Sequence, residues 1–358
     1  MLFESLRPVL IDWGRLLIAL PFFFFSSTAH ANCLNSSTNE RLSNYCLLKR
    51  SAGKVTTLSV AKVIDRRFKN EGYAKGLGLE GEADTFTLNP FVAPILDYET
   101  DINGGNPDRP LQLGNITFVG DPNFVRKEGI VAGAGAGIFG RYLAGEGRYV
   151  DYSLGGSYAH SVDHDIGIKK RFGNICSKNH IKRFWYLDGC ARTNYIEKDL
   201  SDETSHTLSL TGSKLFSSTP NSEHQVSLGI NRLFAERYEQ NQLSIGFQTI
   251  HSNGWHTSLN STLGEKVKGE NALREAYAAS LSLPVFNRRL SLGGSYSEAN
   301  GSRLLGIKRK DKTWAASLSY NVYSSIDVVI GYVETTSTID YFDVSTPTVG
   351  LRVSPIVF

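Results

Sequence analysis

Short alternating segments follow one another through most of the chain. In 206–216, Leu208, Leu210 and Phe216 share one side of an extended strand, while serine and threonine residues occupy the other. The same two-residue period returns in 224–234, 242–250 and 314–322. A strand places successive side chains on opposite faces, so this period predicts β-strands with one apolar and one polar face.

The polar side of these segments differs from that of a sheet facing bulk water. Its residues are mostly Ser, Thr, Gly, Asn and Gln rather than Lys and Glu. Aromatic residues recur near segment ends, as at Tyr277, Tyr296, Trp314, Tyr320, Tyr323 and Tyr332. Aromatic belts at both membrane interfaces are typical of transmembrane barrels. Because lipid cannot satisfy an open sheet edge, we expect an all-β, single-chain transmembrane barrel of antiparallel up-and-down strands.

Fourteen strands are expected between residues 85 and 358. They cover 85–98, 128–142, 146–160, 166–176, 183–196, 204–217, 222–234, 241–251, 254–265, 273–285, 288–299, 313–322, 325–335 and 346–358. A fifteenth segment, 114–121, is assigned to a long first outer loop because bacterial barrels have an even number of strands. Links of alternating length place 266–272, 299–312 and 336–345 outside the cell. They also make 175–184 an unusually long periplasmic turn.

Residues 1–31 have the three parts of a secretory signal peptide. Arg7 and Arg15 precede a short apolar run, and the triplet 29–31 (Ala-His-Ala) matches a cleavage site. The run is too short for a spanning helix, so a mature chain beginning near Asn32 is expected. Residues 32–84 do not alternate, and short helices near 38–49 and 57–70 predict a periplasmic extension or a plug in the barrel mouth.

Cysteine content and charge narrow the class of protein further. The four cysteines form two local pairs, Cys33/Cys46 and Cys176/Cys190, which favours two local disulfides in an oxidising compartment. The absence of a CxxC motif argues against a metal site. A formal net charge of +3 over 358 residues gives no support for binding to nucleic acid.

Enzymatic motifs are absent from the sequence. His160, Asp163, His164 and Asp165 lie close together, but a polar turn between strands explains them better than an acid–base site. No G-x-S-x-G, H-E-x-x-H or P-loop motif occurs. We therefore predict neither a catalytic residue nor a cofactor.

The final segment carries a second indication of the class. It ends in Ile356 and Phe358, and it resembles the last strand of Gram-negative outer-membrane proteins, which the barrel-assembly machinery recognises. This resemblance implies the outer membrane, with its lipids and that machinery as partners. Val349, Leu351 and Val353 are one residue out of phase with it. Pro355, which lacks a donor for the ladder, predicts a bulge that resets the phase.

Motifs at both ends of the barrel resemble the C-terminal barrel of the surface lipoprotein assembly modifier (Slam-like) family. One motif follows the first strand and the other precedes the last, and together they comprise Asp101, Ile102 and Asn103, and Ser337, Ile339, Tyr341, Phe342 and Asp343. The resemblance implies a fourteen-stranded barrel that helps an exported partner protein reach the cell surface. The family normally has a helical-repeat domain before its barrel, whereas residues 32–84 have room for two short helices.

Three functions are consistent with these observations. The first is translocation or surface assembly of an exported protein, and the alternative is a passive porin-like channel for small solutes. The third is a structural, adhesive or enzymatic surface barrel. Lys214, Arg274 and Arg352 are candidate lumen charges, and a positive constriction would prefer anions. The expected location is the outer membrane of a Gram-negative bacterium, with the N-terminal segment in the periplasm.

Overall fold

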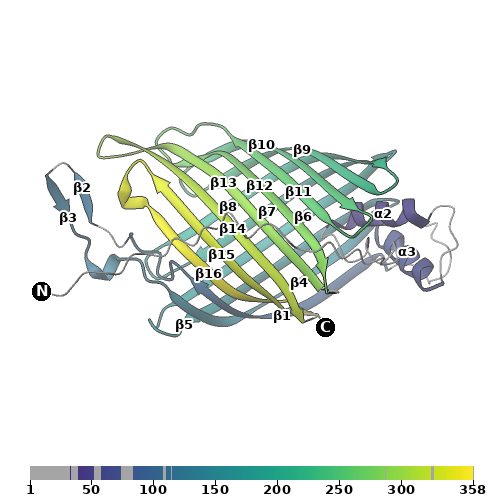
Figure 1. Cartoon of the computed structure of the whole chain (residues 1–358), viewed down its shortest axis with the longest axis horizontal. Helices are drawn as coiled ribbons and strands as arrows, with labels where there is room; N and C mark the ends of the chain where they lie inside the picture. Colours follow the sequence, from purple (N-terminus) through teal and green to yellow (C-terminus); the bar gives the residue numbers. More distant parts are fainter. Residues whose placement is uncertain are drawn as a thin grey trace, which may run out of the picture.

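A closed antiparallel barrel makes up most of the computed structural model (Figure 1). The structure describes residues 33, 39–51, 58–73, 84–107, 110–113, 115–286, 288–323 and 326–357. Fourteen strands of this part of the chain form the barrel, which confirms the predicted fold class and strand number. They are β1 (Phe86–Glu99), β4 (Gly129–Gly145), β5 (Arg148–Ser161), β6 (Gly167–Lys182), β7 (Trp185–Glu197), β8 (Asp202–Thr219), β9 (Ser222–Ala235), β10 (Glu239–His251), β11 (His256–Gly264), β12 (Ala272–Val285), β13 (Arg288–Leu304), β14 (Ile307–Tyr323), β15 (Ile326–Ser337) and β16 (Val344–Val353). The predicted signal peptide, 1–31, lies outside the described residues.

The ring closes where the last strands meet the first. Each barrel strand pairs with its neighbours in sequence, and β16 returns to β1 with Leu351 opposite Leu96. After a break at 354–355, the short strand β17 (Ile356–Val357) continues the pairing, with Ile356 opposite Val92. The side chains of Leu351 and Ile356 both face outward, although residues five apart in a regular strand lie on opposite faces. The phase reset expected at Pro355 is therefore confirmed.

The two faces of the barrel wall have the chemistry that the alternation predicts. On β8 and β9 the outward side chains are apolar and open, with Leu208 53%, Leu228 57% and Ile230 60% exposed. The lumen-facing positions between them carry serine, glutamine and asparagine. Tyr277 lies beside Tyr296, which lies beside Trp314, as an outward aromatic ladder across three strands. A closed sheet that is apolar outside and polar inside is the arrangement that spans a membrane.

Two expected links turn out to be strand. Residues 175–184 were expected as a long turn, but β6 continues to Lys182 and only residues 183–184 turn, both with positive φ. Likewise, 299–312 was expected as a loop, but β13 and β14 extend to a tight turn at 305–306. Polar residues interrupt the apolar face in both stretches, as they can at strand ends beyond the hydrocarbon region. Alternation could therefore not reveal them.

The two ends of the barrel differ. The end with the turns at 146–147, 183–184 and 220–221, which we call the turn end, holds helices α2 (Glu40–Ser51) and α3 (Leu58–Asn70) (Figure 1). The opposite, loop end carries the long segment 100–128, with the hairpin β2 (Leu111–Leu113) and β3 (Ile116–Phe118). The short helices η2 (Pro122–Phe124) and η3 (Asp340–Phe342) also belong to loop-end segments. Among the described helices, none is long and apolar enough to cross a bilayer.

Candidate functional site: the plugged lumen

The N-terminal helices pack into the turn end of the lumen. We call residues 39–51 and 58–73 the plug. Leu42 and Leu47 of α2 are buried in one apolar cluster with Tyr186, Leu215 and Ile250, which come from the inner faces of β7, β8 and β10. Helix α2 is buried on nearly all sides, which explains its lack of a clear apolar stripe. Of the two expectations for residues 32–84, the described part therefore favours the plug.

Both predicted disulfides are present. Cys33–Cys46 ties the chain ahead of α2 to the middle of that helix, and both residues are fully buried in the same apolar cluster. Cys176–Cys190 joins β6 and β7 at positions directly opposite each other in register. The first bridge therefore joins Cys33 to the plug, and the second lies in the barrel wall.

Two buried ion pairs attach α2 to the wall. Arg41 Nη1 donates to both carboxylate oxygens of Asp188 on β7, at 2.9 and 2.8 Å. Arg50 Nη2 donates to Glu223 Oε2 on β9 at 3.0 Å, with both side chains at most 5% exposed. Buried charges of this kind are tolerated only when paired, because removal of one partner leaves the other desolvated. The wall thus supplies carboxylates that match the two arginines of α2.

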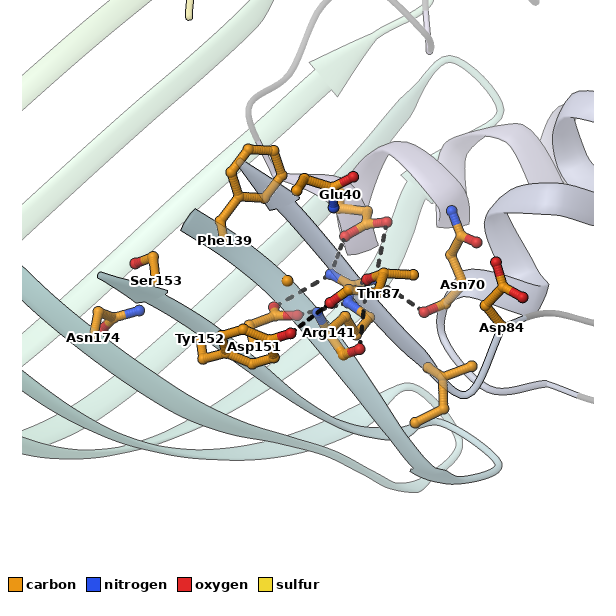
Figure 2. Close-up of a pocket in the computed structure, with 13 residues that line it drawn as sticks. Glu40, Asn70, Asp84, Thr87, Phe139, Arg141, Asp151, Tyr152, Ser153 and Asn174 are labelled. Atoms are coloured by element: carbon orange, nitrogen blue, oxygen red, sulfur yellow. Dashed lines mark hydrogen bonds and ion pairs between the residues drawn. The ribbon is translucent and has the colours of Figure 1, made fainter. Parts of the chain in front are cut away.

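Arg141 of β4 forms a third attachment with the charges reversed (Figure 2). Its guanidinium donates to Glu40 Oε2 of α2 at 2.8 Å and to Asp151 Oδ1 of β5 at 2.6 Å. It also donates to the backbone carbonyl of Asn70 at 3.0 Å, so it contacts both plug helices. The ring of Tyr149 lies 4.0 Å from the guanidinium carbon, which adds a cation–π contact. Arg141 is therefore the wall residue that holds both helices.

Glu71, just after α3, is a buried acid in the plug. Its carboxylate is 3% exposed and accepts a hydrogen bond of 2.7 Å from Asn44 Nδ2 of α2. Burial and the neighbouring charge of Glu40 raise the pKa of Glu71 to about 7, against the opposing effects of the Asn44 hydrogen bond, Arg41 and Arg141. Helix packing at the turn end therefore includes a group that titrates near neutral pH.

A polar cavity of about 580 Å³ remains between the plug and the wall (Figure 2). The plug contributes Glu40 and Asn70 to its lining, and Asp84 lies just before β1. Most of the other lining residues come from β1, β4, β5 and β6, and include Thr87, Asn89, Phe139, Arg141, Asp151, Ser153 and Asn174. The lining therefore contains three carboxylates and one guanidinium, which is engaged by two of them, Glu40 and Asp151.

The three candidate lumen charges occupy different places. Lys214 has the outward phase of Leu208 and Leu210, and its ammonium lies 4.9 Å from the ring centroid of Trp185. The residues on either side of it, Ser213 and Leu215, face the lumen, so Lys214 is not a lumen residue. Arg274 lies at a bulge in β12, between the registered residues 273 and 275. Arg352 has the inward phase of the lumen and is exposed there.

The motif after the first strand folds the long loop over the barrel rim. Ile102 is fully buried in a cluster with Val131 and Ile168. Asn103 donates to the carbonyl of Val125 at 2.8 Å and accepts from the amide of Lys127 at 2.9 Å. Asp101 accepts from the amide of Gly104 and pairs with Lys198 at 3.1 Å. These residues therefore order the loop itself.

The motif before the last strand orders a second loop. The amide of Ser337 donates to Asp343 Oδ1 at 2.7 Å, and its hydroxyl donates to Asp311 Oδ1 at 2.6 Å. Ile339 is 7% exposed, and the ring of Tyr341 contacts Phe342 edge-on. No hydrogen bond or ion pair among the described residues joins the two motifs. The residues of each motif therefore stabilise their own loop.

The histidine and aspartate cluster is a turn, as its sequence suggested. Residues 162–166 link β5 to β6 at the loop end, and His160 Nε2 lies 3.2 Å from Asp165, which is fully exposed. Within the described part of the chain, no group of three or more His, Cys, Asp or Glu residues could hold a metal ion. Ile356 lies opposite Val92, whereas Phe358 lies outside the described residues.

Sequence reasoning missed the residues that attach the plug. Arg141, Asp188 and Glu223 lie on the lumen phase of their strands, so a search for charges on that phase would have found them. Their partners on α2 could not be identified in this way, because which helix charge meets which strand depends on how α2 enters the barrel.

Comparison with known proteins gives structural matches alone. No protein-family model and no curated protein matches the chain. Among solved structures, OccK9 (OpdG) of Pseudomonas aeruginosa is 9% identical, with a TM-score of 0.42, over 77% of this chain and 100% of that one. OprB of Pseudomonas putida is 8% identical, with a TM-score of 0.44, over 76% and 94%. The outer-membrane protein OprD of P. aeruginosa is 9% identical, with a TM-score of 0.41, over 78% and 96%.

These structural similarities are weak, although they cover most of each chain. With TM-scores of 0.41 to 0.44, function must be argued from the lumen of this chain itself. Nothing in the comparisons supports the surface lipoprotein assembly modifier family specifically.

Proposed function

We propose that the protein is an outer-membrane channel for small polar solutes, narrowed at one end by its own N-terminal plug. The observation that carries the proposal is the polar cavity of about 580 Å³ that remains beside the plug, inside a closed barrel with an apolar exterior. A fourteen-stranded barrel is wide enough to hold more than its own wall side chains. Here the plug takes up part of that space and leaves a polar remainder.

The orientation follows from the lengths of the links. Short turns lie on the periplasmic side of outer-membrane barrels, and longer loops lie outside. The turn end, with α2 and α3, would accordingly face the periplasm, and the segment 100–128 would lie on the cell surface. A solute entering from outside would therefore meet the plug last.

The charges of the cavity favour cations. Glu40, Asp84 and Asp151 line it together with Arg141, which binds Glu40 and Asp151. Rings of carboxylates select for cations in channels. None of the three candidate lumen charges, Lys214, Arg274 and Arg352, lines this cavity, so they do not offset its carboxylates.

Single-channel recording in a planar bilayer tests this proposal. The chain without residues 1–31 should give small, discrete conductance steps, and its reversal potential in a KCl gradient should show a preference for K⁺ over Cl⁻. Arg41→Gln with Arg50→Gln should add larger steps, because it removes two plug attachments. Absence of conductance from both folded proteins would contradict a channel, and a preference for Cl⁻ would contradict the assigned selectivity.

The hypothesis of protein translocation gains no support from the comparisons. Its two motifs order loops at the barrel rim, through contacts such as Asn103 with Val125 and Ser337 with Asp343. These contacts give the motif residues a structural role that involves no exported partner. The channel is therefore the function that we propose.

A further inference from the structure

The seam between the first and last strands is the least paired junction of the barrel. β1 is in register with β4 along its whole length, Phe86–Glu99. On its other side, four registered pairs are present among the described residues, two with β16 and two with β17. Between them, Ala93, Pro94 and Ile95 lie opposite residues 352–355 without a registered partner. Each missing pair weakens the closure.

Prolines are concentrated at this seam. Those within the barrel strands or the break are Pro90, Pro94, Pro284, Pro347 and Pro355, and all except Pro284 belong to the strands that close the ring. The backbone amide of Leu143 in β4 donates to the carbonyl of Thr85. The backbone N–H and C=O groups of odd-numbered residues in β1 therefore point toward β4, and those of even-numbered residues point toward the seam. Pro90 and Pro94 therefore leave two positions without a donor on the seam side.

The seam strand is also apolar on both faces. From Pro90 to Leu96 no polar side chain occurs. Val92 and Leu96 face outward, 40% and 46% exposed, whereas Phe91 and Ile95 face the lumen. Elsewhere, as on β8 and β9, the lumen face is mostly polar. A hydrocarbon chain lying across β1 would thus meet apolar side chains from the membrane to the lumen.

A cation lies on the lumen side of the break. Arg352 faces inward two residues before Ser354, is exposed, and forms no ion pair within the described residues. Asp327, opposite Arg352 on β15, accepts a hydrogen bond of 2.8 Å from Asn321 instead. An anionic group inside the lumen would find Arg352 available beside the apolar strand.

We propose that the barrel opens sideways between β1 and β16–β17 and admits the hydrocarbon chain of an anionic amphiphile, with its head group toward Arg352. The path joins the lumen to the membrane and is separate from the axial path beside the plug. Four features coincide at this junction: few registered pairs, two prolines without a donor, a strand that is apolar on both faces, and a cation with no ion pair among the described residues. We therefore assign the portal to it.

Quenching of tryptophan by brominated chains tests the portal. Trp185, Trp255 and Trp314 are replaced by Phe, and a single tryptophan is introduced by Phe91→Trp or by Phe172→Trp. Phe172, on β6, is a matched control because both rings face the lumen and cover a glycine, Gly137 for Phe91 and Gly155 for Phe172. The full chain without residues 1–31 is reconstituted in vesicles, and its fold is checked by circular dichroism.

Two sources of the chain are distinguished by two probes. Vesicles of brominated phosphatidylcholine with brominated phosphatidylglycerol present membrane lipid, and 9,10-dibromostearate added to unbrominated vesicles presents a free fatty acid. An excess of at least twofold at position 91 over position 172 with the brominated lipids identifies membrane lipid as a source, and the same excess with dibromostearate identifies a free fatty acid. Arg352→Gln should reduce the excess severalfold, because the head group loses its partner.

A disulfide across the seam supplies the decisive control. Leu96→Cys with Leu351→Cys, a directly opposed pair, should lock the portal and abolish the excess quenching. Ile330→Cys with Val349→Cys locks β15 to β16 instead and should leave the excess unchanged. Equal quenching at positions 91 and 172 with both probes, or excess quenching that survives the seam lock, would overturn the proposal.

Discussion

Burial decides how much each ion pair between the plug and the wall contributes. Arg50 and Glu223 are almost fully buried, so Glu223→Gln would remove the carboxylate that neutralises the desolvated Arg50 guanidinium at this contact. Such a loss costs about 3 kcal/mol, which is roughly a hundredfold in the equilibrium between docked and released plug. Amide hydrogen exchange in Glu40–Ser51 should accelerate accordingly.

An exposed pair offers the matched control for this substitution. Lys169 and Glu197 lie 2.7 Å apart with side chains 50% and 35% exposed. Because solvent already screens this pair, Glu197→Gln should leave exchange in α2 unchanged. Equal effects of the two glutamine variants would show that burial does not set the strength of the attachment.

Glu71 makes plug docking depend on pH. Its pKa in the docked plug is raised to about 7 from an ordinary value of 4.5, so the docked state binds the proton more tightly than the released state. The stabilisation is complete below pH 4.5 and is lost as the pH rises through 7. Between pH 5 and pH 8 the opening constant should rise by up to roughly seventyfold.

The fraction of time that the channel spends in its larger conductance state reports this equilibrium. It should increase from pH 5 to pH 8 in the unaltered protein. Glu71→Gln keeps an acceptor for Asn44 but removes the charge, so it should remain mostly in the smaller state across this range. A pH dependence that persists in Glu71→Gln would assign the titration to another group.

At the scale of elements, the two disulfides should have unequal effects. Cys33–Cys46 holds Cys33 against the middle of α2 in the apolar cluster, whereas Cys176–Cys190 joins strands already paired from Lys169 to Lys182. Cys33→Ala with Cys46→Ala should therefore speed exchange in α2 and increase the larger conductance. Cys176→Ala with Cys190→Ala should change neither measurement. Faster exchange in α2 in this second variant would contradict the assignment of Cys176–Cys190 to the wall alone.

Alternation was sufficient to predict the strands because lipid and lumen impose opposite chemistry on their two faces. It was insufficient at 175–184 and 299–312, where polar residues interrupt the apolar face. The helices near 38–49 and 57–70 were recognised, but their contacts were not. Arg41 and Asp188 are far apart in sequence, and no local pattern encodes that they meet. Local periodicity thus predicts elements, and the candidate site depends on how two elements dock.

Considered as a whole, the molecule joins two parts with different sources of stability. The barrel is a closed hydrogen-bonded ladder, in which every strand supports two neighbours. The plug consists of helices of 12 and 13 residues, which are marginal in isolation. It is held by side-chain pairs, one apolar cluster and a disulfide. Local release of the plug should therefore require less free energy than opening of the ring.

This difference predicts two separate steps on heating. In detergent, the helical circular dichroism signal should decline at a lower temperature than the strand signal, and the first step should reverse on cooling because the barrel remains as a template. Conductance in a heated bilayer should rise over the first step, since the lumen is then unobstructed. Glu223→Gln should lower the temperature of the first step and leave the second unchanged, because its partner Arg50 belongs to the plug. If both signals instead changed in one transition, and Glu223→Gln did not split it, plug and barrel would unfold as one unit.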